Sequence, residues 1–330
     1  MKHALRLNSL FIACATLAAC DGGGISVDIT GPSFKAGSEI SEPVASIGTV
    51  RVNGGIRVNG VHYDTHSATV LINGVVSTKD DLETGQFVQV EGRVGGLGLT
   101  GDATFVNMDA NIIGPVESVD FDDNALTVMG QTVFVGTTTR FGAGLDPNDL
   151  GSVRLGARVA VNGFATGDGG LEATRIDLAP ADAMAQVIGP AIAVDNGQRS
   201  FRVGALDVDY GNSRVIELPS GFPRAGDTVL VRGVFANDML VADELRATYA
   251  TGPRAVRQRV YLEGLVTEFT NTGAFDVGAH QVSTTGTTQY RNGVAEDLGV
   301  DSQIRVYGRI GSDGVTIVAD TITHMTLIER

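Results

Sequence analysis

The sequence predicts an all-β fold that is built from four copies of one small domain. Three observations predict it: a short phrase recurs, apolar and polar residues alternate within it, and Gly, Asn and Asp separate the alternating runs. The phrase is Val or Ile followed by x-Val-x-Gly, and it occupies residues 88–92, 159–163, 229–233 and 304–308. Its glycines lie 71, 70 and 75 residues apart, which is the size of a small domain and not of a solenoid coil.

Each unit is expected to contain five strands. Alternation in short runs between turn residues predicts half-buried antiparallel strands. The first strand is expected to start at a glycine, namely Gly48, Gly114, Gly189 and Gly264. Second strands are expected around residues 56–58, 126–128, 201–203 and 275–277, and a third strand as at residues 132–135. The recurring phrase is the fourth strand and closes on its glycine, and the fifth strand is expected at residues 103–105, 171–176, 240–245 and 317–322.

An Asp-Leu pair follows the third strand in three of the units, at residues 81–82, 149–150 and 297–298. These segments have the pattern of a single helical turn, whereas the third unit has Pro219, Gly221 and Pro223 there and is expected to keep a loop. Five strands with at most a short helical turn between the third and the fourth is the layout of the OB-fold, a small Greek-key barrel. The prediction is therefore a tandem array of four OB-like barrels, with a continuous β-sandwich as the alternative.

The repeats set the predicted domain boundaries. Residues 1–19 are a predicted signal peptide and residues 20–44 a flexible tether, which is rich in Gly and Ser. The four β domains are then expected at residues 45–110, 111–182, 183–255 and 256–330.

The N-terminal segment predicts export and a lipid anchor. A charged start, a short apolar run and small residues describe a secretory signal, and Leu-Ala-Ala-Cys at residues 17–20 resembles the bacterial lipobox. That resemblance implies lipidation of Cys20, which would hold the chain in the bacterial cell envelope, facing the periplasm or the cell surface. Asp21 resembles an inner-membrane retention signal, but its use differs between lineages, so inner and outer membrane both remain open.

The composition of the chain argues against some classes of binding partner and metal site. The formal net charge is −14, and loss of residues 1–19, which carry Lys2 and Arg6 and no acidic residue, would remove two more positive charges. Such an acidic chain is a poor nucleic-acid binder, because that binding needs Lys and Arg to displace counterions. Cys14 leaves with the signal and Cys20 carries lipid, so no disulfide or cysteine metal site is expected. No cofactor is implied.

With these patterns, the chain resembles the domain-of-unknown-function 5666 family, a repeated β domain of bacterial lipoproteins. The features that carry the resemblance are Gly-x-Val at Gly48 and Gly114, the x-Val-x-Gly strands, and Leu-x-Ala-x-x-Ile at residues 171–176. It covers about residues 45–327 and is strongest in the second unit. The resemblance implies a fold and no known activity.

Two sets of residues are candidate sites. His62, Asp64 and His66 alternate along the predicted third strand of the first unit, so their side chains should leave one face and could hold a divalent metal such as zinc. Tyr63, Tyr210 and Tyr290 are the aromatic residues expected on a ligand face, since OB-folds often stack ligands on aromatic rings there. The alternatives are a solvent-facing strand for the first set and partial burial for the second.

The sequence contains no Gly-x-Ser-x-Gly nucleophile elbow and no His-Glu-x-x-His motif, so the chain is predicted not to be an enzyme. The expected function is a non-catalytic binding or interaction module with an envelope protein or a glycan as its partner. The alternatives are an architectural spacer of the envelope, and a metal-dependent binder or enzyme that uses His62, Asp64 and His66.

Overall fold

A computed structural model of the chain describes residues 41–325 except 97, 148, 219 and 249–255. The predicted signal peptide, Cys20 and nearly all of the predicted tether lie outside the described residues. The fold is all-β, and its helical content is three short 3-10 turns. The described residues belong to one compact unit. In the described part of the chain, no helix has the length and hydropathy to cross a membrane.

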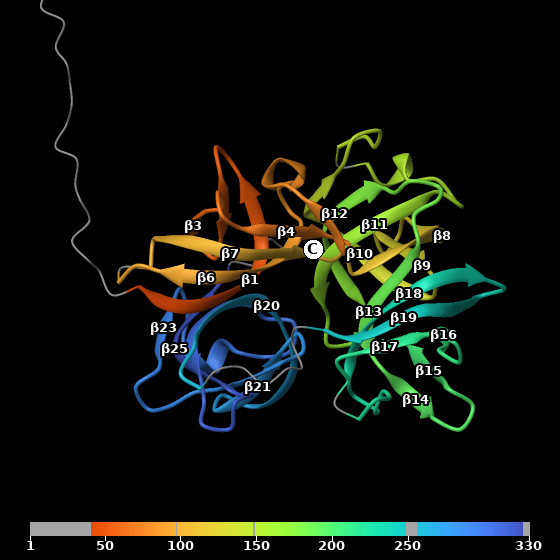
Figure 1. Ribbon diagram of the computed structural model, residues 1–330. Helices are drawn as coiled ribbons and strands as arrows, with labels where there is room; N and C mark the ends of the chain where they lie inside the picture. The colour runs from red at the N-terminus through yellow and green to blue at the C-terminus, as the bar shows by residue number, and fades with distance from the viewer. Residues whose placement is uncertain (1–40, 97, 148, 219, 249–255, 326–330) are drawn as a thin grey trace, which may run out of the picture. The chain divides into compact units, whose positions relative to one another are not determined.

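The first and fourth repeats belong to one hydrogen-bonded sheet of 13 strands (Figure 1). The first repeat consists of β1 (Glu42–Val52), β2 (Ile56–Val58), β3 (Val61–Asp64), β4 (Thr69–Ile72), β5 (Val75–Ser77), η1 (Lys79–Asp81), β6 (Phe87–Val94) and β7 (Thr100–Met108). The fourth repeat consists of β20 (Arg259–Asn271), β21 (Ala274–Val277), β22 (His280–Ser283), β23 (Gln289–Arg291), η3 (Ala295–Asp297), β24 (Gln303–Ile310) and β25 (Ile317–His324).

The second and third repeats belong to a second sheet, of 12 strands. The second repeat consists of β8 (Ile112–Asp120), β9 (Ala125–Val128), β10 (Gln131–Phe141), η2 (Leu150–Ser152), β11 (Arg158–Ala165) and β12 (Leu171–Leu178). The third repeat consists of β13 (Ala185–Pro190), β14 (Ile192–Asp195), β15 (Ser200–Val203), β16 (Leu206–Asp209), β17 (Arg214–Ile216), β18 (Thr228–Ala236) and β19 (Met239–Ala247).

The pairing order is the same in every repeat. In the second repeat, β8 pairs with β9, β9 with β10, β10 with β12, β12 with β11, and β11 with β8, so the ladder closes into a ring. The first and fourth repeats close in the same order, and in the third the first strand is interrupted at Ala191 between β13 and β14. The contact between the third and fifth strands is parallel in all four repeats, unlike the antiparallel pairing expected throughout. The fourth strand runs opposite to the third, and the hairpin after it reverses the chain again. The fifth strand therefore runs in the same direction as the third.

The recurring glycines lie inside the fourth strand, and the expectation that they close it is wrong. Each strand continues past its glycine, and the register shifts there by a β-bulge, at Gly92, Gly163, Gly233 and Gly308. A Cβ at Gly233 would come within 1.9 Å of the Val241 carbonyl oxygen, and the other three would approach the fifth strand almost as closely. Glycine recurs because the bulge presses the backbones of two strands together.

The first strands also begin earlier than predicted. β1 starts at Glu42, and Val44 is buried, so residues 42–44 belong to the folded part and not to the tether. Gly48 lies in the middle of β1, and the same holds for the glycines Gly114, Gly189 and Gly264 in their strands. A Cβ at Gly114 would lie 2.5 Å from the Met129 side chain, and each of the other three glycines likewise leaves room for a neighbouring side chain.

The Asp-Leu pairs form the predicted short turns. Asp149 caps η2 by accepting a hydrogen bond from the Gly151 N–H at 2.8 Å, and the adjacent Leu150 is buried in the hydrophobic core. Leu82 and Leu298 are buried in the same way beside η1 and η3. In the third repeat, the described residues between β17 and β18 contain no such turn, as Pro219, Gly221 and Pro223 predicted.

Sheet pairing joins the repeats in two pairs. β1 of the first repeat pairs in parallel with β20 of the fourth, and β8 of the second pairs antiparallel with β13 of the third. The cores follow this arrangement: the second and third repeats share one hydrophobic cluster, and the first and fourth have a cluster each. Nothing in the local sequence pattern predicts these pairings, and the four domain boundaries remain a prediction.

Candidate functional site

The residues predicted to hold a metal do not share one strand. β3 ends at Asp64, whose Oδ1 accepts a hydrogen bond from the His66 N–H at 2.8 Å. His66 therefore lies in the following turn, and the expected alternation stops at Asp64. Among the described residues, no three His, Cys, Asp or Glu side chains are grouped so that they could hold a metal ion. The structure does not bring His62, Asp64 and His66 together around a common point.

Two of the three candidate ligand-face tyrosines are buried, so they cannot serve as a stacking platform. Tyr63 is 1% exposed and Tyr210 is 2% exposed. Burial raises the pKa of both phenols. The Tyr210 hydroxyl donates to Asn196 Oδ1 at 2.6 Å, and its ring packs on Phe201. Tyr290 is half-buried, with its ring centroid 6.4 Å from that of His324.

Each repeat instead presents one outward row across its first three strands. The row members are register partners, and the strand neighbours of the members on the second and third strands are mostly buried, so alternation turns the row away from the core. The rows are Arg51, Arg57 and His62 in the first repeat, Ser118, Thr127 and Thr132 in the second, Ile192, Arg202 and Asp207 in the third, and Glu268, Asp276 and Gln281 in the fourth. We call these the outward rows. The scaffold is repeated, but the row is cationic in the first repeat, hydroxyl-bearing in the second, mixed in the third and acidic in the fourth.

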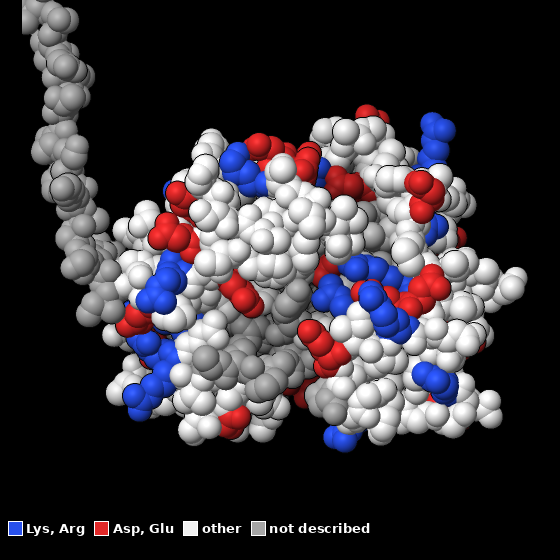
Figure 2. All heavy atoms as spheres, in the orientation of Figure 1, with Lys and Arg blue, Asp and Glu red and all other residues white. Residues whose placement is uncertain are grey.

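The acidic row shows how close these side chains lie. Glu268 and Asp276 are directly opposite on β20 and β21. Partial burial, followed by the neighbouring Glu268 charge, raises the pKa of Asp276 above its ordinary value. On the face drawn in Figure 2, basic and acidic side chains are interspersed and do not form one large patch of a single sign.

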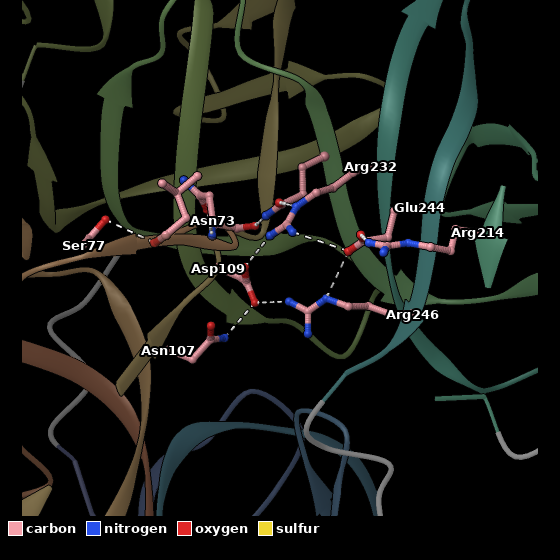
Figure 3. Close-up of polar contacts among 11 residues, drawn as sticks. Asn73, Ser77, Asn107, Asp109, Arg214, Arg232, Glu244 and Arg246 are labelled. Atoms are coloured by element: carbon pink, nitrogen blue, oxygen red, sulfur yellow. Dashed lines mark hydrogen bonds and ion pairs between the residues drawn. The ribbon is translucent and has the colours of Figure 1, made fainter. Parts of the chain in front are cut away.

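A buried charge cluster lies where the first three repeats meet (Figure 3). Asp109, in the connection between β7 and β8, contacts Arg232 Nη2 at 2.6 Å and Arg246 Nη2 at 2.5 Å. Glu244 lies 3.5 Å from Arg232 and 3.6 Å from Arg246 and so balances the second positive charge. The Asp109 side chain is only 7% exposed. We call Asp109, Arg232, Glu244 and Arg246 the charged junction.

The connection that carries Asp109 is held from three sides. Ala110 N–H donates to Asn73 Oδ1 in the turn between β4 and β5 at 2.9 Å. Asn111 Oδ1 accepts from the Gly163 N–H of β11 at 2.9 Å, and its carbonyl oxygen accepts from the Ile188 N–H of β13 at 2.7 Å. Both Asp109 oxygens and the guanidinium groups of Arg232 and Arg246 contact other protein groups, which makes the junction a structural element.

The seam between the first and fourth repeats has its own polar contacts. Asn59 Nδ2 donates to the carbonyl oxygens of Ile47 and Tyr261, both at 2.9 Å, and so joins β1 to β20. Buried Glu263 of β20 accepts a hydrogen bond from Thr49 Oγ1 of β1 at 3.4 Å. At the end of the seam, Glu42 binds Arg259 and Arg309. These contacts fix the register of the parallel pair.

A pH dependence of stability is expected from Glu42. Hydrogen bonding to Arg259, with Arg309 adding to it, lowers the pKa of Glu42 below its ordinary value of 4.5. Because the native pKa is depressed, this contribution is present above pH 4.5 and is lost as the pH falls through the lower native value. Glu42→Gln should therefore lower the melting temperature more at neutral pH than at a pH below the depressed native pKa, where wild-type Glu42 is protonated as well. An equal difference at both pH values in thermal unfolding would contradict this assignment.

Comparison with known families identifies the repeat. A family model described as a domain of unknown function, DUF5666, matches residues 43–100, 113–177 and 263–323, which is more than half of the chain. The chain belongs to the DUF5666 family. The three matched DUF5666 segments are the first, second and fourth repeats, and the third repeat has the same strand order without a match. No curated protein matches the chain.

The sequence missed the charged junction of this DUF5666 protein. Arg232 and Arg246 lie 123 and 137 residues from Asp109, so no local motif connects them. Arg232 stands in the x position directly before Gly233, where the other repeats have Glu91, Asn162 and Tyr307. The positive charge of Arg232 is the only local signal of the junction, and it does not identify the carboxylate that Arg232 contacts.

Proposed function

We propose that this chain is a non-catalytic interaction module of the bacterial cell envelope, attached to a membrane through lipid on Cys20. Its four repeats are OB-like domains in this proposal. The support is the order of pairing, first-second-third-fifth-fourth-first, with a parallel contact between the third and fifth strands. OB-folds bind ligands on the face of their second and third strands. The four outward rows occupy that face, and their different chemistry is the observation that carries the proposal.

Pairing between the first and last repeats favours an interaction module over a spacer. A spacer gains reach with each added unit, but here β20 returns to pair with β1, so the fourth repeat adds surface and not length. Joined repeats also hold several different rows on one body, and such rows can engage one partner together. A metal-dependent function receives no support from the positions of His62, Asp64 and His66.

The partner class follows from charge and location. An envelope protein or a glycan fits rows that mix arginine, hydroxyl and carboxylate groups, because each such group binds through directed hydrogen bonds. Nucleic acid is not part of the proposal, since the chain has 38 Asp and Glu against 24 Lys and Arg. The protein would face the periplasm or the cell surface.

Site-specific photo-crosslinking in intact cells tests the proposal. A photoreactive amino acid would replace the second-strand member of each row, in turn Arg57, Thr127, Arg202 and Asp276, in the full chain. We expect one reproducible partner from one or two of these positions, identified by mass spectrometry. The exposed Leu155, which lies between η2 and β11, is the matched control position. The same products from all five positions, or none from any row, would show that the outward rows are not the binding face.

A further inference from the structure

Two arginines face each other on the outward row of the first repeat. Arg51 of β1 is the register partner of Arg57 of β2, and His62 of β3 is the next partner in line. Most of their flanking residues are buried, namely Val50, Ile56, Val58, Val61 and Tyr63, whereas Val52 is 38% exposed. Directly opposed side chains in an antiparallel pair have Cβ atoms about 4.5–5.5 Å apart. The row therefore places two guanidinium groups and an imidazole side by side on the solvent face.

The described residues supply no ion-pair or hydrogen-bond partner for this pair of like charges. Other arginines of this acidic chain, such as Arg175 and Arg305, have carboxylate partners. Like charges directly opposite each other destabilise a strand pair, so the fold alone gives no reason to keep both.

The equivalent rows show that the fold does not require these arginines. In the third repeat, Arg202 is flanked by Ile192 and Asp207, and the second and fourth repeats have no cation in the row. A pair of directly opposed cations is thus particular to the first repeat, whereas the fourth repeat opposes two carboxylates. Arg202 also supplies a matched position at which one arginine lies on the same strand of the same scaffold.

Two acidic residues on neighbouring strands, Asp64 and Asp102, are not register partners of either arginine. Asp64, the next outward residue of β3, caps the turn by accepting the His66 N–H. Asp102 of β7 lies beside Asp64 and opposite Arg93 of β6. His62 packs over Gly55 of the turn that joins β1 to β2, with Nε2 at 2.7 Å from where a Cβ would be. The imidazole therefore lies on the same face as Arg51 and Arg57, displaced along β2 toward the β1–β2 turn.

We propose that Arg51, Arg57 and His62 bind a phosphate group. This deepens the proposed function, on which it rests, by assigning a ligand class to one row. A guanidinium binds two oxygens through parallel N–H donors, and a phosphate monoester or diester offers enough oxygens for two guanidinium groups and an imidazole N–H. The phosphate could come from a lipid headgroup or from a soluble phosphate. A monoester or inorganic phosphate can balance both charges of the arginine pair, and a lipid diester balances one of them.

Phosphate titration of the full chain tests the site. Melting temperature would be followed against inorganic phosphate, with sodium chloride at matched ionic strength as the reference. The wild type and Arg202→Gln should both gain stability with phosphate. Arg57→Gln and Arg51→Gln should each bind phosphate about tenfold more weakly, the loss of one charged hydrogen-bonding group. Without phosphate, both variants should be at least as stable as the wild type, because the like-charge contact is gone.

Vesicles of phosphatidylcholine with and without phosphatidylglycerol separate the two sources. If the wild type and Arg202→Gln are retained on the anionic vesicles and Arg57→Gln is not, the bound phosphate is that of a lipid headgroup. If only inorganic phosphate has an effect, the bound phosphate is a soluble one. Equal responses in all variants, or none in the wild type to either probe, would overturn the phosphate site. That result would not affect the crosslinking expected from the other rows. Conversely, a phosphate response without any crosslinked partner would contradict the interaction module but not the phosphate site.

Discussion

Asp109→Asn is expected to lower the free energy of unfolding by about 3–5 kcal/mol, the cost of breaking a buried ion pair from one side. Asparagine preserves the shape of the side chain, but its amide cannot balance Arg232 and Arg246, whose contacts with Asp109 are 2.6 and 2.5 Å. Both arginines are 13% exposed and would keep their charge with only Glu244 nearby. Urea unfolding of the full chain measures the change as a lower midpoint at constant slope.

Asp80→Asn is the matched control for this prediction. Asp80 pairs with Lys79 on the surface and is 78% exposed, so its replacement should change stability by no more than about 0.5 kcal/mol. A double-mutant cycle with Arg246→Gln adds a second check, because residues in one network have non-additive effects. Similar small losses for Asp109→Asn and Asp80→Asn, or strictly additive losses in the cycle, would show that the junction contributes little.

The fold could be predicted from the sequence wherever the signal is local. Alternation placed the second, fourth and fifth strands of every repeat, because the pleat puts every other side chain in the core. The Asp-Leu pairs gave the 3-10 turns, since an aspartate caps the turn and the next leucine reaches the core. The family could be named on the same core and turn positions that its model matches.

Glycine was misread because its roles look alike in sequence. A glycine after an alternating run suits a turn, a bulge and a close backbone approach equally well. In this chain the x-Val-x-Gly glycines are bulges, and Gly48 and its counterparts make room for a neighbouring side chain. Which role applies depends on the partner strand, which the local pattern does not contain.

The positions of the candidate site residues also depend on strand register and on pairing between repeats. Tyr63 lies between His62 and Asp64 on one strand, so alternation alone assigns it to the opposite face, and the structure buries it. The outward rows need the register of three strands, and the charged junction needs the pairing of repeats more than 100 residues apart. Register within a hairpin is almost readable from turn length, but pairing between repeats is not.

Gly233→Ala is expected to destabilise the protein by about 3 kcal/mol, at the upper end of the usual cost of overpacking. The added Cβ would lie 1.9 Å from the Val241 carbonyl oxygen and 2.9 Å from the Ala242 Cα, and both belong to the backbone of β19. No rotamer change can relieve a clash with backbone. The bulge between Arg232 and Gly233 must therefore open or β18 must shift against β19.

Gly286→Ala is the control that separates this clash from the general effect of replacing glycine. No atom lies within 4 Å of a Cβ at Gly286, and its φ is not in the left-handed region. Alanine there should be neutral or should stabilise the protein by up to about 1 kcal/mol, because it restricts the unfolded chain. Gly308→Ala, with its Cβ 2.4 Å from the Val318 carbonyl oxygen, should resemble Gly233→Ala. If thermal and urea unfolding place Gly233→Ala with Gly286→Ala instead, then the bulge adapts to a side chain, and the recurrence of glycine at this position in all four repeats has another cause.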